Sequence, residues 1–171
     1  YNTRMAIIRT VGSLENKSIL QAPFRWYGEM FLRITQSISR RQELVADALA
    51  SAVAGAGAMI ESLKAVHGLA PAYASYMQNE VMPLLNGGYR PPLSSGFMQY
   101  AQTKPITEAM ANLVDAQLKE SKSDPFDSHP ALSERIRAIQ SLPAKNILDT
   151  HTPAISLIDD CFQLEQEMLA T

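Results

Sequence analysis

Apolar side chains recur every three or four positions along nearly the whole chain. This spacing places them on one side of an α-helix, and no run of four or more residues alternates between apolar and polar as a half-buried strand does. The pattern therefore predicts an all-α fold. Its longest segment is 20–54, which could form one long helix or two in series, and Pro23 there suits a first helical turn. Five apolar residues there are predicted to form a core face: Phe24, Tyr27, Phe31, Ile34 and Ile38.

Glycines and prolines predict where the other helices begin and end. Gly68 is a natural residue to end a helix over 58–66, and Pro71 suits the start of the next helix. That next helix is predicted to bend or end early at Pro83 and to stop at 86–88, before an irregular loop over 89–95. Four more helical segments follow: 97–101, one that opens at 103–105, one from Pro130 to Pro143 with Leu132, Ile136 and Ile139 on its apolar side, and 153–169 with Ile155, Ile158, Phe162, Leu164 and Met168.

Length and charge narrow the possible functions. With 171 residues, the chain is predicted to form a single domain. Its 15 basic and 17 acidic residues give a net charge of −2, which argues against nucleic acid as a partner, since nucleic-acid-binding proteins usually carry a basic surface. No stretch approaches the ~20 apolar residues of a membrane-spanning helix, and no signal peptide is visible. We therefore predict a soluble chain, with any membrane anchor of the parent protein outside it.

Two carboxylates stand one helical turn apart, at Glu43 and Asp47, so they share a side of the predicted helix. The same side is predicted to continue through small residues, which would let a second helix pack closely: Ala46, Ala50, Ala54 and Gly57. At such an interface the carboxylates would need a cation, hydrogen bonds or a metal, because an isolated buried charge is costly. Alternatively, this side is exposed and the carboxylates are solvated, with Arg40 or Arg41 as loose partners.

A histidine precedes the predicted helix at Pro130. His129 is not committed to a packed helical face there, so its ring could point into a cleft and donate a hydrogen bond to an oxyanion or transfer a proton. The alternative is a helix-start side chain bonded to neighbouring backbone. Arg135 follows six residues later, which is not a same-face spacing, so local geometry alone does not bring it together with His129.

The remaining chemistry-bearing residues indicate no second site. The sequence has three histidines and no His-Glu-x-x-His, the helical pair that binds zinc in metalloproteases. His67 is predicted to interact with the dipole of a helix end, and His151 to lie in a loop. The single cysteine, Cys161, is predicted to be a small core residue, because the two aspartates before it disfavour a thiolate. Asn16 begins a glycosylation sequon, which we attribute to chance.

Two segments in this order resemble a family of zinc metallopeptidases that includes the CaaX-prenyl proteases and the heat-shock membrane protease HtpX. The first segment matches Ser-Arg-x-x-Glu-x-x-Ala-Asp, here Ser39, Arg40, Glu43, Ala46 and Asp47. The second matches His-Pro-x-Leu-x-Glu-Arg-Ile, here residues 129–136. The separation between them is also similar to the family's. The resemblance divides the predicted domain into an N-terminal segment 1–19, a peptidase-like region 20–142 and a C-terminal loop and helix 143–171.

The resemblance implies a site for one zinc ion. It implies that Glu43 is the third zinc ligand beside two histidines, and that Asp47 orients a ligating imidazole. His129 and Arg135 would stabilise the tetrahedral intermediate that forms when metal-activated water attacks a peptide bond. The family's His-Glu-x-x-His, which supplies the other two ligands and the general base, is absent from 1–171. We therefore expect the C-terminal part of a catalytic domain that is incomplete on its N-terminal side.

These inferences lead to two hypotheses. In the first, the chain belongs to a zinc-dependent endopeptidase that acts on proteins or peptides, in a parent protein at the bacterial inner membrane or in the cytoplasm. The chain alone would then be inactive and would bind zinc weakly. In the second, it is a non-catalytic helical binding or scaffold module. A missing metal-binding helix would leave an apolar face uncovered, which predicts self-association.

Overall fold

The structure, a computed structural model, describes residues 21–119, 123–143 and 153–170. The regular elements within these ranges are all helical, which confirms the predicted all-α fold. They are α2 (Gln21–Ala54), α3 (Ala56–Tyr76), the π-helix η1 (Met77–Val81), α4 (Met82–Asn86), α5 (Leu93–Ala101), α6 (Lys104–Lys119), α7 (Leu132–Gln140), the 3₁₀-helix η2 (Ala154–Leu157) and α8 (Cys161–Met168). The predicted segment 1–19, the sequon at Asn16 and His151 lie outside the described residues.

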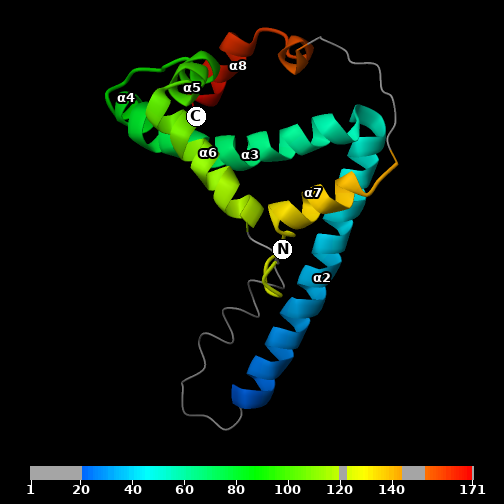
Figure 1. Ribbon diagram of the computed structural model, residues 1–171. Coiled ribbons are helices and arrows are strands. Elements are labelled where there is room, and N and C mark those ends of the chain that lie inside the picture. The colour runs from blue at the N-terminus through cyan, green and yellow to red at the C-terminus, as the bar shows by residue number, and fades with distance from the viewer. Residues whose placement is uncertain (1–20, 120–122, 144–152, 171) are drawn as a thin grey trace.

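Helix α3 is the centre of the arrangement. It packs against α2, α5, α6 and α7, while α4, α5 and α8 gather near one end of it and the long α2 extends from the other (Figure 1).

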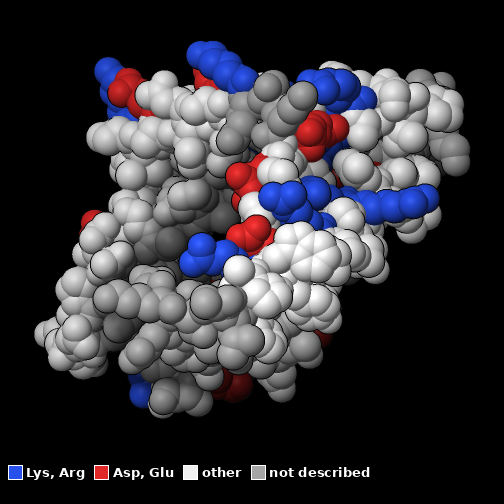
Figure 2. Space-filling model, turned by 90° about the horizontal axis from the view of Figure 1, so that it is seen from below, with Lys and Arg blue, Asp and Glu red and all other residues white. Residues whose placement is uncertain are grey.

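Seen from below, acidic and basic side chains are interspersed on one region of the surface, so opposite charges lie close together there (Figure 2). Across the described ranges, we find no helix with the length and apolarity needed to cross a membrane.

A single residue, Gly55, separates α2 from α3. Its φ of 91° lies in a region that residues with a Cβ rarely adopt, so glycine suits this corner. The corner allows α3 to pack against α7, where four buried residues form one core: Leu63, Leu132, Ile136 and Ile139. The predicted apolar side of the helix near Pro130 is thus confirmed, although α7 begins at Leu132.

Helix α2 buries a different side from the one that its apolar stripe predicts. Of the five residues predicted to face the core, four expose more than half of their surface: Phe24, Tyr27, Ile34 and Ile38. The buried side is polar and includes Gln36, Asp47 and Ser51. The prediction was wrong because periodicity identifies a stripe without saying which neighbour covers it.

The small residues that follow Glu43 and Asp47 do not form a close helix interface either. Ala46, Ala54 and Gly57 are exposed, so the face predicted from them is wrong. The buried side continues from Asp47 to Ser51 instead, whose hydroxyl donates to the Asp47 carbonyl at 2.7 Å. Self-association through an apolar face that a missing metal-binding helix would leave uncovered stays a prediction.

Gly68 and Pro71 lie inside α3, so the predicted helix end and helix start at these residues are wrong. Gly68 is buried where α3 meets α6, and a Cβ there would lie 3.3 Å from the Cβ of Met110. Glycine at this position therefore permits close helix packing rather than a helix end. The irregularity predicted near Pro83 takes the form of the π-helix before it, and the helix stops at 86–88 as predicted.

A second, aromatic core lies at the far end of α3. Tyr76 packs against Phe97 and Tyr100 of α5, with ring centroids 5.7 and 5.4 Å away. Val81 and Leu93 complete the buried cluster. Since α5 begins at Leu93, it starts inside the segment predicted to be an irregular loop, four residues before the predicted helix start at Phe97.

Helix α8 is held against α5 by polar contacts. The sequence predicts one amphipathic helix over 153–169, but the structure has η2 and α8, and the five apolar residues of that pattern are exposed. The buried residue is Glu165, whose carboxylate accepts hydrogen bonds from the backbone N–H groups of Leu93, at 2.9 Å, and Ser94, at 3.0 Å, and from the Ser94 hydroxyl. Cys161 is half-buried beside this carboxylate, with Sγ 3.6 Å from Oε1, so its predicted core position is wrong.

Candidate functional site

A polar stripe runs along the side of α2 that faces α7 and the loop before it. Its members are three, four or seven positions apart and therefore share one side of the helix. We use the name polar stripe for these six residues: Arg33, Gln36, Arg40, Glu43, Asp47 and Ser51. The solvated alternative for Glu43 and Asp47 is wrong, since Asp47 is 3% exposed and the Glu43 side chain 24% exposed.

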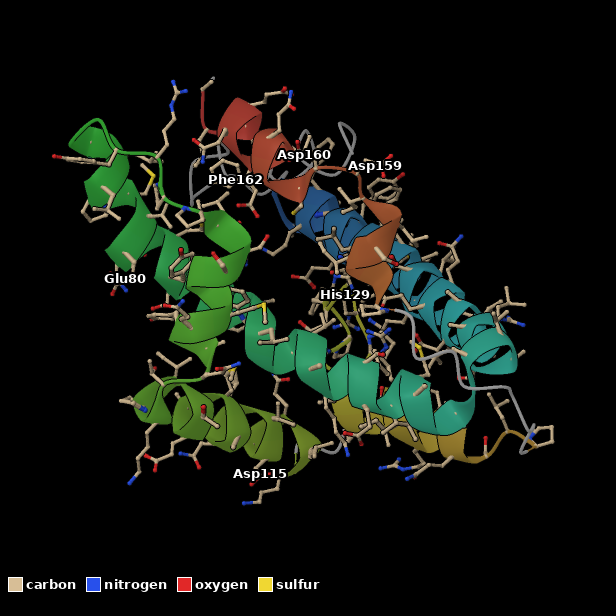
Figure 3. The ribbon with its side chains drawn as sticks, turned by 90° about the horizontal axis from the view of Figure 1, so that it is seen from above. Glu80, Asp115, His129, Asp159, Asp160 and Phe162 are labelled. Atoms are coloured by element: carbon tan, nitrogen blue, oxygen red, sulfur yellow. The ribbon has the colours of Figure 1, made fainter. Side chains whose placement is uncertain are left out.

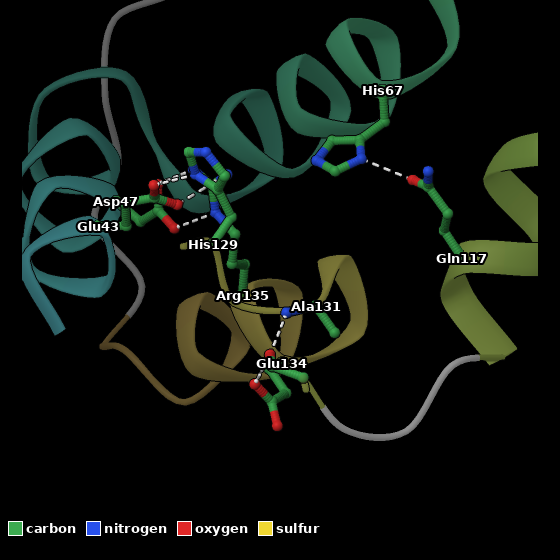
Figure 4. Close-up of polar contacts among 9 residues, drawn as sticks. Glu43, Asp47, His67, Gln117, His129, Ala131, Glu134 and Arg135 are labelled. Atoms are coloured by element: carbon green, nitrogen blue, oxygen red, sulfur yellow. Dashed lines mark hydrogen bonds and ion pairs between the residues drawn. The ribbon is translucent and has the colours of Figure 1, made fainter. Parts of the chain in front are cut away.

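Asp47 is neutralised by an arginine from α7. Nε of Arg135 donates to Oδ2 of Asp47 at 2.8 Å, and Nη2 donates to Oδ1 at 2.6 Å, which gives a two-point pair (Figure 4). This geometry matches the planar guanidinium to the planar carboxylate. The hydrogen bonds to Asp47 raise the pKa of Arg135 above its ordinary value, so the guanidinium stays charged. Both oxygens of Asp47 are therefore committed to holding Arg135.

Glu43 lies one turn before Asp47 and is only partly satisfied. Its Oε1 is hydrogen-bonded to Nδ1 of His129 (Figure 4). Its Oε2 is buried, accepts no hydrogen bond from any described residue, and lies 3.5 Å from Nη1 of Arg135. A buried carboxylate oxygen with a cation nearby but no hydrogen bond is able to accept one more partner.

His129 reaches this carboxylate from the loop before α7, and its side chain is 73% exposed. Because an ionised carboxylate only accepts, Nδ1 carries the hydrogen of this bond and Nε2 remains on the open side of the ring. The helix-start alternative, in which the ring bonds to neighbouring backbone, is wrong. The structure thus brings together His129, Arg135 and Glu43, a convergence that local spacing could not provide.

Arg40 holds the loop that carries His129. Its Nη1 donates to the backbone carbonyl of Asp127 at 2.7 Å, with longer bonds to those of Pro125 at 3.2 Å and Asp124 at 3.4 Å. Arg33, which lies about two turns before Arg40 on the polar stripe, covers the ring of Phe126, with its Cζ 5.0 Å from the ring centroid. Sequence reasoning named Arg40 as a motif residue and as a loose partner of the carboxylates, but it did not assign Arg40 to this loop. Its position three residues before Glu43 was the signal that both face the same loop.

Ser123 ties the other end of this loop to α7. Its hydroxyl donates to Oε2 of Glu134 at 2.7 Å and accepts from the backbone N–H of Ala131 at 2.6 Å (Figure 4). With Arg40 on one side and Ser123 on the other, the loop is fixed at two points. His129 is therefore positioned by hydrogen bonds to the backbone around it and not by burial of its own ring.

A cavity of about 210 Å³ opens beside His129. It lies between α3, α6 and the loop, and its lining includes His67 and Gln117, whose Nδ1 and Oε1 are 2.6 Å apart (Figure 4). His67 sits in the interior of α3 and pairs with α6, so its predicted role at a helix end is wrong. Sequence reasoning missed this placement because 50 residues separate the two side chains.

The described residues include no group of three His, Cys, Asp or Glu side chains arranged to hold a metal ion. They do include one suitable donor. Oε2 of Glu43 is a buried carboxylate oxygen without a hydrogen bond in the described structure, and zinc accepts such an oxygen as one of its ligands. Within this part of the chain, the residues therefore fit one ligand of a zinc site and not a complete site.

Comparison with protein families matches residues 4–142 to Peptidase family M48. This span contains Glu43, Asp47, His129 and Arg135. Comparisons with curated proteins and with solved structures gave no match.

Proposed function

This chain belongs to peptidase family M48, and we propose that it supplies one zinc ligand and the carbonyl-binding side chains of a zinc-dependent endopeptidase. In this proposal Glu43 binds the metal, and His129 and Arg135 stabilise charge on the substrate carbonyl. The observation that carries it is the convergence of these three side chains on one point, with Oε2 of Glu43 left without a hydrogen bond among the described residues.

The contacts suggest which part of the site each residue would supply. A bound zinc ion would supply the activated water that attacks a peptide bond. The two imidazole ligands and the general base would come from a His-Glu-x-x-His helix, a motif that residues 1–171 lack. The described residues contribute the remaining ligand atom, Oε2 of Glu43, beside a permanent cation, Arg135, that limits the cost of burying the carboxylate.

His129 has the exposure and orientation that carbonyl binding requires. Glu43 fixes the tautomer by accepting from Nδ1, and a protonated ring would present Nε2–H toward the open cavity side. A hydrogen bond from that atom strengthens as negative charge develops on the carbonyl oxygen. Arg135 adds positive charge at the same place, and Asp47 holds its guanidinium in a fixed plane. Asp47 and Arg40 are then positioning residues, which act through Arg135 and through the loop.

The first experiment uses the whole protein that contains this chain and compares Glu43→Gln with Glu61→Gln. Glu61 is a matched control, because it lies on α3, is 73% exposed and pairs only with Lys64 of the same helix among the described residues. We expect Glu43→Gln to remove peptidase activity and bound zinc, as measured by casein cleavage and by elemental analysis. Undiminished activity in Glu43→Gln would remove Glu43 from the mechanism.

His129→Gln separates carbonyl binding from metal binding. Loss of one oxyanion donor typically lowers kcat by about 10²–10³, and the zinc content should be unchanged because His129 is not a ligand in this proposal. A variant that loses zinc together with activity would place His129 on the metal instead.

The isolated 171-residue chain tests the incomplete site. We expect no peptidase activity, and no stoichiometric zinc after dialysis, because a single carboxylate binds zinc weakly. Tightly held zinc that depends on Glu43 would overturn this expectation. If the whole protein also lacks activity and zinc, the non-catalytic scaffold function is supported. The location of the parent protein at an inner membrane or in the cytoplasm stays a prediction from the resemblance.

A further inference from the structure

The cavity beside His129 is placed where a substrate side chain would enter. His129 forms part of its wall, so a carbonyl bound at this ring in the proposed function would lie beside the cavity. An extended peptide advances by about 3.3 Å per residue, which puts the next side chain within reach of the opening. Seen from above, His129 lies near the middle of the molecule, whereas Asp115 lies on the outer side of α6 (Figure 3).

The size of the cavity fits one amino-acid side chain. Its volume of about 210 Å³ is below the roughly 300–1,000 Å³ of pockets that hold drug-sized ligands. One part of the lining is apolar, from Pro130, Ala131 and Leu132, and suits a methylene stem. The other lining residues are polar and come from α3, α6 and the loop. A long side chain with a polar end matches this division.

The polar part of the lining includes two hydrogen-bond acceptors, one on His67 and one on Asp127. An amide oxygen cannot donate, so Nδ1 of His67 carries the hydrogen in the bond to Oε1 of Gln117, and Nε2 of the neutral ring is an acceptor. Figure 4 shows this second nitrogen on the side of the ring turned toward His129. Asp127 also lines the cavity, and it is the only acidic side chain among the described lining residues.

We propose that this cavity binds the side chain of a lysine or arginine that adjoins the scissile bond, which makes His67, Gln117 and Asp127 specificity-determining residues. The apolar wall takes the stem, and Asp127 and Nε2 of His67 accept hydrogen bonds from the cationic end. This inference rests on the proposed function, because it assigns the substrate class of the same site.

The test compares Asp127→Asn with Asp115→Asn in the whole protein. Asp127 accepts a bond from the backbone N–H of Asp124 at 3.1 Å, and asparagine keeps an acceptor for it, so the loop should retain its shape. Asp115→Asn makes the same change of charge on an exposed residue of α6 outside the cavity lining. Two peptides serve as substrates, identical except that one carries lysine and the other norleucine beside the cleaved bond.

We expect wild-type protein to cleave the lysine peptide with a kcat/KM about tenfold above that of the norleucine peptide, the effect of one charge-assisted hydrogen bond. Asp127→Asn should abolish this preference, while Asp115→Asn should preserve it. Equal cleavage of both peptides by the wild type would overturn the cavity assignment and leave the peptidase function standing. Failure of the peptidase function is a separate result, since Glu43→Gln would then have no effect on either peptide.

The same preference should be measurable without cleavage. NMR titration of the isolated chain with Nα-acetyl-lysine methylamide should shift the signals of His67 and Gln117, and the norleucine analogue should bind about tenfold more weakly. Equal affinities for the lysine and norleucine compounds would contradict a cation-selective cavity. So would a loss of lysine affinity in Asp115→Asn that equals the loss in Asp127→Asn.

Discussion

Two regions of this molecule bury carboxylates, and they satisfy the hydrogen bonds of these carboxylates in different ways. At the far end, Glu165 of α8 is satisfied by two backbone N–H groups and a hydroxyl at the start of α5. On the polar stripe, Asp47 is satisfied by Arg135, but its neighbour Glu43 keeps one buried oxygen without a hydrogen bond in the described structure. Full satisfaction indicates a carboxylate that holds helices together, and partial satisfaction one that is available for binding.

The comparison also separates two kinds of stability. The region where α3 meets α5 and α8 combines an aromatic core with a neutral set of donors for Glu165. The stripe depends on a charge pair, which contributes little net stability when intact but is costly to break on one side. The predictions below test whether the three carboxylates differ in this way.

The largest effect is expected from Arg135→Met. Asp47 would remain buried without its cation, which typically lowers the free energy of unfolding by about 3–5 kcal/mol. Urea denaturation measures this loss, and Arg137→Met, at an exposed position of the same helix, is the control. The double variant with Asp47→Asn should lose less than the sum of the single variants. A loss below about 1 kcal/mol in Arg135→Met would mean that this pair contributes no more to stability than an exposed ion pair does.

A smaller loss is expected from Glu165→Ala. The N–H groups of Leu93 and Ser94 would lose their acceptor, at a cost of about 1–3 kcal/mol. Glu167→Ala, at an exposed position two residues later, should change stability by less than about 0.5 kcal/mol. Hydrogen exchange at the first turn of α5 should accelerate in Glu165→Ala alone. Equal effects in the two variants would show that α8 is not anchored by Glu165.

The pH dependence of stability should distinguish Glu165 further. The Ser94 hydroxyl, followed by backbone N–H groups, lowers the pKa of Glu165 below its ordinary value of 4.5. A carboxyl with a lowered folded pKa stabilises the fold above its unfolded pKa, and this contribution disappears as the pH falls through the folded value. Unfolding free energies measured from pH 6 down to about pH 3 should therefore fall less steeply in Glu165→Gln than in the wild type. Parallel curves would contradict this assignment.

The smallest effect on stability is expected from Glu43→Gln. One oxygen of Glu43 accepts no hydrogen bond among the described residues, and the other bonds to an exposed histidine, so the amide should change the free energy of unfolding by less than about 1 kcal/mol. Urea denaturation measures the change. A loss as large as that of Arg135→Met would make Glu43 a structural residue and would weaken the proposed function.

Local features of this fold were predictable from the sequence. The helical period, the stop at 86–88 and the buried side of α7 each depend on residues close together in the chain. The predicted core face of α2 failed, because the same period is compatible with either side facing inward. The predictions of a helix end at Gly68 and a helix start at Pro71 failed for a related reason. Packing against α6 decides whether the glycine ends a helix or permits close contact within it.

The sequence by itself selected the residues of the candidate site, because the resemblance pointed to Glu43, Asp47, His129 and Arg135. Only the tertiary structure decided how they pair, since 86 residues separate Glu43 from His129 and 88 separate Asp47 from Arg135. It also supplied the partners of Arg40, His67 and Glu165, which are distant in sequence and leave no local periodic signal. The physical reason is that a hydrogen bond or ion pair depends on distances of about 3 Å in space, which chain spacing fixes only within one helix.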